Sequence, residues 1–317
     1  MSGVELGMST LGYGCSALLG PNSRDYALGL LETAFDSGVT HFDVARAYGS
    51  GDAEGVLGQF ISTRRDLVTV TTKLGSAPPT GLASQKLVRN TARRVMRLSP
   101  RLRAALGRQG SRMVRRHAFS PEDARTSLET SLRALRTDHV DVLLLHSARP
   151  EDCTPELLDY LQTAREEGKI SRIGVGTDAG SAATILREMP EFAELVQFDH
   201  SVLSPNIRRI PPESDAAVIT HGSLAGIGGL RAYLTDHPDE AQRWSEELGA
   251  DCSDPAVLAA LMLLYAVRTS RGGPVLFAST RPDNIRANAA AVANGSYSRE
   301  QVERFAALAG ATGVEQP

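Results

Sequence analysis

The chain has 317 residues, of which 42% are hydrophobic and 22% charged, and its formal net charge is -3 at pH 7. This hydrophobic content supports a full core and excludes a disordered or low-complexity protein. The mild negative charge excludes a protein whose overall charge attracts nucleic acid or an anionic membrane. No apolar run approaches the roughly 18 residues that span a bilayer, and no export signal is visible, so we expect no membrane association.

The three cysteines, Cys15, Cys153 and Cys252, are widely spaced and odd in number. They form neither a disulfide framework nor a paired metal motif, so we expect a cytoplasmic protein without a metal site. Aromatic residues make up only 5% of the chain, with a single Trp, which is little material for stacking on nucleic acid bases. We therefore expect no nucleic acid partner.

Short apolar, β-branched runs alternate with helical patterns along the chain. The predicted strands, in chain order, are residues 11–15, 39–44, 67–73, 140–146, 171–176, 195–199, 217–220 and 274–278. Several are apolar throughout, such as VDVLLLH at 140–146, which is typical of parallel strands covered on both faces. The helices between them begin at recognisable cap residues, which are Ser23, Ser120, Thr154, Asp254 and Ser298.

This alternation of strands and helices predicts one α/β domain over residues 1–317. The length fits a (β/α)₈ TIM barrel, which needs about 250 residues or more, and a doubly wound sheet is the alternative. The segment GVGTDAG at 174–180 is a loose version of the Rossmann glycine motif. It lies in mid-chain, and Glu194 fits the ribose-binding position poorly, so we favour the barrel.

A basic insertion interrupts the pattern after the third predicted strand, over residues 76–119. No Asp or Glu occurs between Leu67 and Pro121, and Arg recurs from Arg89 to Arg116. Leu87, Thr91, Val95 and Leu98 have helical spacing, which predicts a cationic amphipathic helix. The insertion follows Lys73 directly. We therefore expect it to shape the substrate pocket, as a lid over a bulky or anionic substrate, rather than to dock an acidic protein partner.

Four polar side chains stand where consecutive predicted strands end. Asp43 and Tyr48 follow the second strand, Lys73 ends the third and His146 ends the fourth. Each has a purely structural explanation when taken alone, but a TIM barrel brings these strand ends together at its active-site face. His139 and His146 are seven residues apart, on opposite faces of a strand, so they are not a metal-ligand pair.

Together the four groups suit proton transfer to a carbonyl oxygen. A free phenol has a pKa near 10, and a neighbouring ammonium lowers that pKa. We therefore expect Asp43 to keep Lys73 charged, and Lys73 to lower the pKa of Tyr48. Tyr48 would then protonate the carbonyl oxygen, with His146 donating a hydrogen bond to the same oxygen.

The sequence resembles the aldo-keto reductase superfamily over nearly the whole chain. The resemblance rests on the four residues above and on motifs in the right order, namely LGYGC at 11–15, FDVARAYGSGDAEGVLG at 42–58, TTKLG at 71–75, VDVLLLH at 140–146, GKISRIGVG at 168–176, LVQFD at 195–199 and STRPDNIRANAAA at 279–291. It implies a TIM barrel oxidoreductase that uses a nicotinamide cofactor, usually NADPH, on a carbonyl or alcohol substrate.

The resemblance also assigns the cofactor-binding residues. Gln197 matches the glutamine that holds the nicotinamide carboxamide. Ser279, Arg281, Asn284 and Asn288 match positions that grip the adenosine 2′-phosphate and adenine, and a helix starting at Pro282 agrees with phosphate binding. The remaining positions implied by the family are Gly14, Cys15, Thr177, His221 and Leu224.

Three positions depart from the family pattern. Gly176-Thr177 replaces the usual Ser-Asn, His221 replaces a stacking Tyr, and Ala278 replaces a Lys. The predicted cofactor is NADPH, and the loss of the Lys leaves NADH open. Two alternative functions also stay open, which are a cofactor-binding regulatory or interaction protein with little turnover and a non-redox sugar-modifying enzyme.

Overall fold

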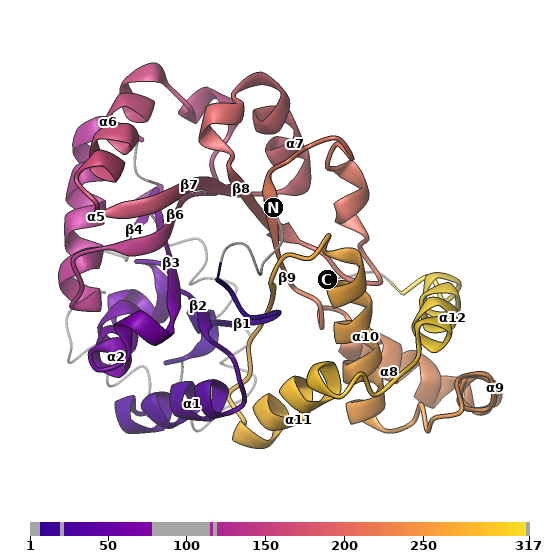
Figure 1. Cartoon of the computed structure of the whole chain (residues 1–317). Helices are drawn as coiled ribbons and strands as arrows, with labels where there is room; N and C mark the ends of the chain where they lie inside the picture. The colour runs from indigo at the N-terminus through magenta and orange to yellow at the C-terminus, as the bar shows by residue number, and fades with distance from the viewer. Residues whose placement is uncertain (1–6, 20–21, 78–114, 117–118, 315–317) are drawn as a thin grey trace.

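The computed structural model describes residues 7–19, 22–77, 115–116 and 119–314 (Figure 1). Within these ranges eight parallel strands close into a barrel in the order β1-β10-β9-β8-β7-β6-β3-β2. They are β1 (Leu11–Gly14), β2 (His41–Asp43), β3 (Thr69–Leu74), β6 (Val140–His146), β7 (Ile170–Gly176), β8 (Leu195–Asp199), β9 (Ala217–His221) and β10 (Val275–Phe277). The predicted TIM barrel is confirmed, and the doubly wound sheet is excluded because the sheet closes on itself.

Helices surround the barrel (Figure 1). They are α1 (Arg24–Asp36), α2 (Ala53–Ile61), α5 (Pro121–Leu135), α6 (Pro155–Glu166), α7 (Ala179–Glu188), α8 (Ile227–Asp236), α9 (Pro238–Leu248), α10 (Pro255–Thr269), α11 (Pro282–Ala293) and α12 (Arg299–Gly310). Each predicted cap accepts a backbone N–H from the first turn of its helix, as found for Ser23, Ser120, Thr154, Asp254 and Ser298. No described helix is long and apolar enough to cross a membrane.

The expected strand–helix alternation breaks between β8 and β9. This fully described stretch holds no α-helix and only the 3₁₀ turn η8 (Asn206–Arg209). Pro205, Pro211 and Pro212 lie in it, and proline removes a backbone donor and disfavours helical geometry in the preceding residue. Ile207 and Ile210 are buried in the main core, so a compact turn covers this part of the wall.

The barrel interior is filled by apolar side chains beneath its carboxyl end. Alternation along the strands points every second residue inward. The interior cluster comprises Met8, Val142, Leu144, Leu195, Ala217, Ile219 and Leu276. His146 and Gln197 lie two residues beyond Leu144 and Leu195, on the same face of their strands. The packed apolar interior therefore lies directly beneath the polar residues at the strand ends.

The two ends of the predicted insertion pair with each other. β4 (Ser76–Ala77) runs antiparallel to β5 (Arg115–Arg116), with Ser76 opposite Arg116. Phe119 is buried close to Gly75, where a Cβ would lie 2.2 Å from the ring. The predicted cationic helix, with Leu87, Thr91, Val95 and Leu98, lies outside the described residues.

Candidate active site

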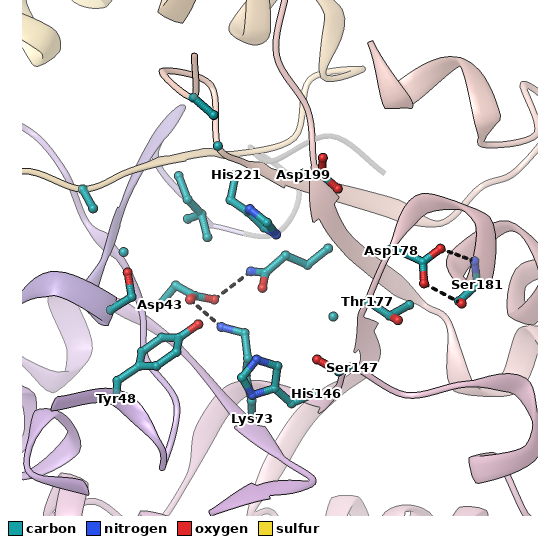
Figure 2. A pocket seen from close by; sticks show the side chains of 18 of the residues that line it. Asp43, Tyr48, Lys73, His146, Ser147, Thr177, Asp178, Ser181, Asp199 and His221 are labelled. Carbon is teal, nitrogen blue, oxygen red and sulfur yellow. Dashed lines mark hydrogen bonds and ion pairs between the residues drawn. The ribbon is translucent and has the colours of Figure 1, made fainter. Parts of the chain in front are cut away.

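A cavity of about 860 Å³ opens at the carboxyl ends of the barrel strands. All four predicted catalytic side chains line it (Figure 2). β2 provides Asp43, β3 provides Lys73 and β6 provides His146, while Tyr48 opens the 3₁₀ turn η2 (Tyr48–Gly51). The structure thus brings together side chains that are as distant in the sequence as Asp43 and His146.

Asp43 and Lys73 form a buried ion pair. Lys73 Nζ donates to Asp43 Oδ1 and lies 3.4 Å from the carbonyl oxygen of Val44. The two residues are only 3% and 2% exposed. Burial by itself would lower the pKa of the Lys73 ammonium, but the Asp43 carboxylate and Tyr48 raise that pKa overall. Lys73 therefore stays charged in this cavity at neutral pH.

Tyr48 lies against the same pair. Its phenol oxygen points toward Asp43 and Lys73 (Figure 2), and Lys73 Nζ lies 5.4 Å from the centre of the ring. Burial raises the pKa of Tyr48, and the charge and hydrogen bond of Lys73 oppose this rise only in part. The expected lowering by Lys73 is thus present but outweighed by burial. Tyr48 is protonated at neutral pH, which is the state that can donate a proton.

His146 adds a neutral hydrogen-bond donor. Burial, and then the Lys73 charge, lower the pKa of His146 to about 4, so the ring is uncharged at neutral pH. Nδ1 is buried without a hydrogen-bond partner among the described residues. A buried N–H without an acceptor costs free energy, which favours placing the single ring proton on Nε2.

The predicted nicotinamide end of the cofactor site surrounds this group. Gly14, Thr177, Gln197, His221 and Leu224 all line the cavity. Gln197 Nε2 donates to Asp43 Oδ2 at 2.7 Å, and Thr177 Oγ1 donates to the carbonyl oxygen of Ala148 at 2.8 Å. The predicted Cys15 is different, because its side chain is fully buried and does not line the cavity.

The residues predicted to hold the adenosine end lie beyond the cavity wall. Ala278 lines the cavity, whereas Ser279, Arg281, Asn284 and Asn288 follow it on the β10–α11 loop and on α11. Ser279 Oγ accepts the backbone N–H of Arg281 at 3.1 Å. Asn288 is 7% exposed, so its side chain belongs to the buried face of α11.

The start of α11 has the features of an anion site. Arg281 precedes the helix without capping it through its side chain. Its guanidinium is exposed and has no ion-pair partner among the residues that the structure describes. Free backbone N–H groups and an unpaired guanidinium together favour a phosphate group. The residues present therefore fit the phosphate of a dinucleotide cofactor.

Sequence reasoning missed a polar rim at and just beyond the carboxyl ends of β6, β7 and β8. The missed residues are Ser147, Arg149, Glu151, Asp178, Ser181 and Asp199. Asp178 caps α7 by accepting the backbone N–H groups of Gly180 and Ser181 at 3.0 and 2.9 Å. The sequence offered one signal for these rim residues, which is that they lie at or soon after the ends of predicted strands. Among the described residues no cluster of His, Cys, Asp or Glu is arranged to hold a metal ion.

Comparison with known proteins agrees with this geometry. The family model "Aldo/keto reductase family" matches residues 5–309. A D-threo-aldose 1-dehydrogenase from a Pseudomonas species is 30% identical over 311 residues, which cover 90% of this chain and 89% of the relative. An NADH-specific methylglyoxal reductase from Escherichia coli (strain K12) is 24% identical, with 96% of this chain and 95% of the relative covered.

Solved structures share the fold. An aldo-keto reductase from Bacillus halodurans in its holo form superposes with a TM-score of 0.69 at 20% identity, over 95% of this chain and 92% of its own. An aldo-keto reductase from Klebsiella pneumoniae in complex with NADPH gives a TM-score of 0.65 at 22% identity, over 96% and 92%. The family match over nearly the whole chain, joined to the cavity described above, establishes that the chain belongs to the aldo/keto reductase family and is an NAD(P)H-dependent oxidoreductase.

Proposed function

We propose that the protein interconverts a carbonyl compound and its alcohol with NADPH as the preferred cofactor, and that Tyr48 exchanges the proton. The observation that supports this most directly is a protonated, half-buried Tyr48 beside the Asp43–Lys73 ion pair in an open cavity. A phenol next to a permanently charged ammonium can release a proton and leave a stabilised phenolate.

In the reduction, each side chain has a separate role. The nicotinamide, when bound, supplies the hydride. Tyr48 donates its proton to the carbonyl oxygen as charge develops there, and Lys73 stabilises the phenolate that remains. His146 donates a hydrogen bond from Nε2 to the same oxygen, which orients and polarises the carbonyl. In the oxidation the phenolate accepts the alcohol proton.

The preference for NADPH rests on Arg281. An exposed guanidinium beside the start of α11 favours the extra phosphate of NADPH over the free hydroxyl of NADH. Ala278 gives no such charge. The relatives include one named NADH-specific and one structure holding NADPH, so both cofactors occur among proteins of this fold.

The cavity lining favours a neutral, hydroxyl-bearing substrate. Its carboxylates are Asp43, Glu151, Asp178 and Asp199, against two cations, Lys73 and Arg149. Because the described lining holds more carboxylates than cations, we favour a neutral substrate over the anionic one considered from the insertion. Hydroxyl groups can pair with the polar side chains, and the relative named D-threo-aldose 1-dehydrogenase supports this class.

The test is NADPH consumption with matched aldehydes. We expect faster turnover of glyceraldehyde and erythrose than of propanal and butanal, and a loss of at least about a hundredfold in Tyr48→Phe, the usual scale for a general acid. Tyr48→Phe should still bind NADPH. Tyr233→Phe on α8 removes a phenol outside the cavity and serves as the matched control.

Three results would contradict this proposal. NADPH binding without turnover of any aldehyde would favour a regulatory barrel. Product formation from a sugar without net cofactor oxidation would favour a non-redox enzyme. Unchanged turnover in Tyr48→Phe would reject Tyr48 as the acid.

A further inference from the structure

Gln197 occupies the centre of the polar cluster. It lies on β8, is 4% exposed, and its Nε2 lies 2.7 Å from Asp43 Oδ2. A carboxylate can only accept hydrogen bonds, so the NH₂ end of the amide must face Asp43. This fixes the orientation of the amide and directs Oε1 away from Asp43.

The contact completes the hydrogen bonding of Asp43. Lys73 binds Oδ1 of the carboxylate and Gln197 binds Oδ2. A bidentate arrangement of this kind determines the plane of the carboxylate, and therefore the position at which it holds the Lys73 ammonium. Without Gln197, a buried charged oxygen would lose its donor and the carboxylate could rotate away from Lys73.

The other end of the amide, Oε1, has no hydrogen-bond donor beside it among the described residues. No hydrogen bond to Gln197 Oε1 is formed by any residue that the structure describes. The register neighbour on β7 is Gly176, where a Cβ would stand 3.4 Å from Oε1, so this neighbour carries no side chain over the oxygen. Oε1 remains available to a donor inside the cavity.

We propose that Gln197 is a positioning residue for the proton donor as well as a cofactor contact. Its NH₂ group holds Asp43 against Lys73, and Lys73 in turn acts on Tyr48, while Oε1 accepts a hydrogen bond from the carboxamide of the nicotinamide. The amide of Gln197 thus links the binding of the nicotinamide to the position of Tyr48, the proton donor. This inference rests on the proposed function for its catalytic part, whereas the Gln197–Asp43 contact concerns the cofactor-free protein.

Two substitutions separate positioning from cofactor contact. Gln197→Met keeps the side-chain length but removes both the donor and Oε1, so saturating NADPH is needed to isolate the loss of the donor. Gln197→Glu places a second carboxyl against Asp43, and two carboxyls that share a site retain one proton well above the usual pKa of the acid. In its protonated form the introduced carboxyl donates to Asp43 as the amide does, and in its ionised form it repels Asp43.

The measurement is turnover at saturating NADPH, relative to the unmodified protein, from pH 5.5 to 8. We expect Gln197→Met to lose about tenfold or more in kcat at every pH, beyond any change in NADPH affinity. Gln197→Glu should lose as much at pH 8 and recover to within about threefold at pH 5.5, as its new carboxyl becomes protonated. The same two substitutions at Gln242, exposed on α9, are the matched controls.

A second readout needs no activity. The urea midpoint of cofactor-free Gln197→Glu, relative to the unmodified protein, should rise as pH falls through the same range, because the shared proton stabilises only the folded state. Taking the ratio to the unmodified protein removes the titration of the other groups that face this end of the barrel, which are Asp43, Tyr48, Lys73, His146, Asp199 and His221.

The outcomes are distinct. An unmodified protein without turnover defeats the proposed function, yet the urea series still decides whether Gln197 holds Asp43. A kcat for Gln197→Met within twofold of normal, with only NADPH affinity reduced, overturns the positioning role. The positioning role is also overturned if neither the turnover nor the urea midpoint of Gln197→Glu, each relative to the unmodified protein, changes with pH.

Discussion

The rings of Tyr48 and His146 meet edge to face, with their centroids 6.1 Å apart and their planes at 90°. Tyr48 and His146 are the two groups that we assign to the carbonyl oxygen. This contact holds them against each other in the cavity. Since each ring limits the rotation of the other, the proton donor and the hydrogen-bond donor are oriented before a substrate arrives. Preorganised donors of this kind are the main source of electrostatic stabilisation in enzymes.

Replacement of His146 should therefore reduce catalysis without disturbing cofactor binding. His146→Leu removes the donor and should lower kcat/KM by about a hundredfold, the scale found for the loss of one oxyanion donor. Steady-state kinetics and an NADPH fluorescence titration measure the two effects. His139→Asn, at a partly exposed position beside Asp138, is the control. A fall in NADPH affinity that accounts for the whole loss would contradict this role.

The Asp43–Lys73 pair predicts an asymmetry in stability. Lys73→Met leaves the buried Asp43 charge without its cation, which should lower the free energy of unfolding by about 3–5 kcal/mol. The double substitution Asp43→Asn with Lys73→Met removes both charges and should recover most of this loss. Urea unfolding of the three proteins measures the difference. Equal stability of the single and double variants would show that the carboxylate finds another partner.

Arg281 predicts cofactor selectivity. Arg281→Gln removes the exposed guanidinium at the start of α11 and should weaken NADPH binding by about tenfold, as expected for one charge-assisted contact, while NADH binding stays the same. Arg286→Gln on the same helix is the matched control, because Arg286 is exposed and paired with Asp283 at 3.1 Å. Equal weakening of NADPH and NADH in Arg281→Gln would mean that Arg281 contacts a group common to both cofactors, and unchanged binding of both would place the adenosine end elsewhere.

Buried histidines predict sensitivity to acid. Burial lowers the pKa of His41 and of His200 to about 4, from an ordinary value of 6.5. Between these values the unfolded chain binds more protons than the folded chain, so the free energy of unfolding falls as pH drops from 6.5 toward 4. Each histidine contributes on the order of 1–3 kcal/mol to this fall.

Urea unfolding across this pH range tests the effect. His200→Gln should make the decline shallower by removing one of the histidines whose pKa burial lowers, a group that also includes His146. His237→Gln, at an exposed position after α8, should leave it unchanged. An equal slope in all three proteins would mean that other groups govern the acid sensitivity.

The barrel and the catalytic cluster were predictable because they depend on local patterns. Continuous apolar runs mark buried parallel strands, and the polar residue that ends such a run lies at the active-site face, as Lys73 and His146 show. The resemblance to a known family then supplied Gln197 and Arg281. Cap residues such as Ser23 and Ser298 have equally local signals.

Other features depend on relationships that the sequence does not display. Nothing in the spacing of Asp43 and Gln197 reveals that they touch, since the contact arises from barrel closure across 154 positions. The net rise in the pKa of Tyr48 follows from the depth of burial, which a motif does not report. The absence of a helix between β8 and β9 is explained by Pro205, Pro211 and Pro212. The regular strands on either side nevertheless led us to expect a helix there.

The short ribbon of β4 and β5 has a consequence for how this barrel tolerates change. Its antiparallel register sets Ala77 opposite Arg115 in a small sheet separate from the barrel, so the two ends of the insertion lie side by side. A two-residue Asn-Gly turn closes such a gap in ordinary hairpins. Because this pairing fixes both ends of the insertion beside β3, we expect a change in the length of the insertion to leave the strand that carries Lys73 in place.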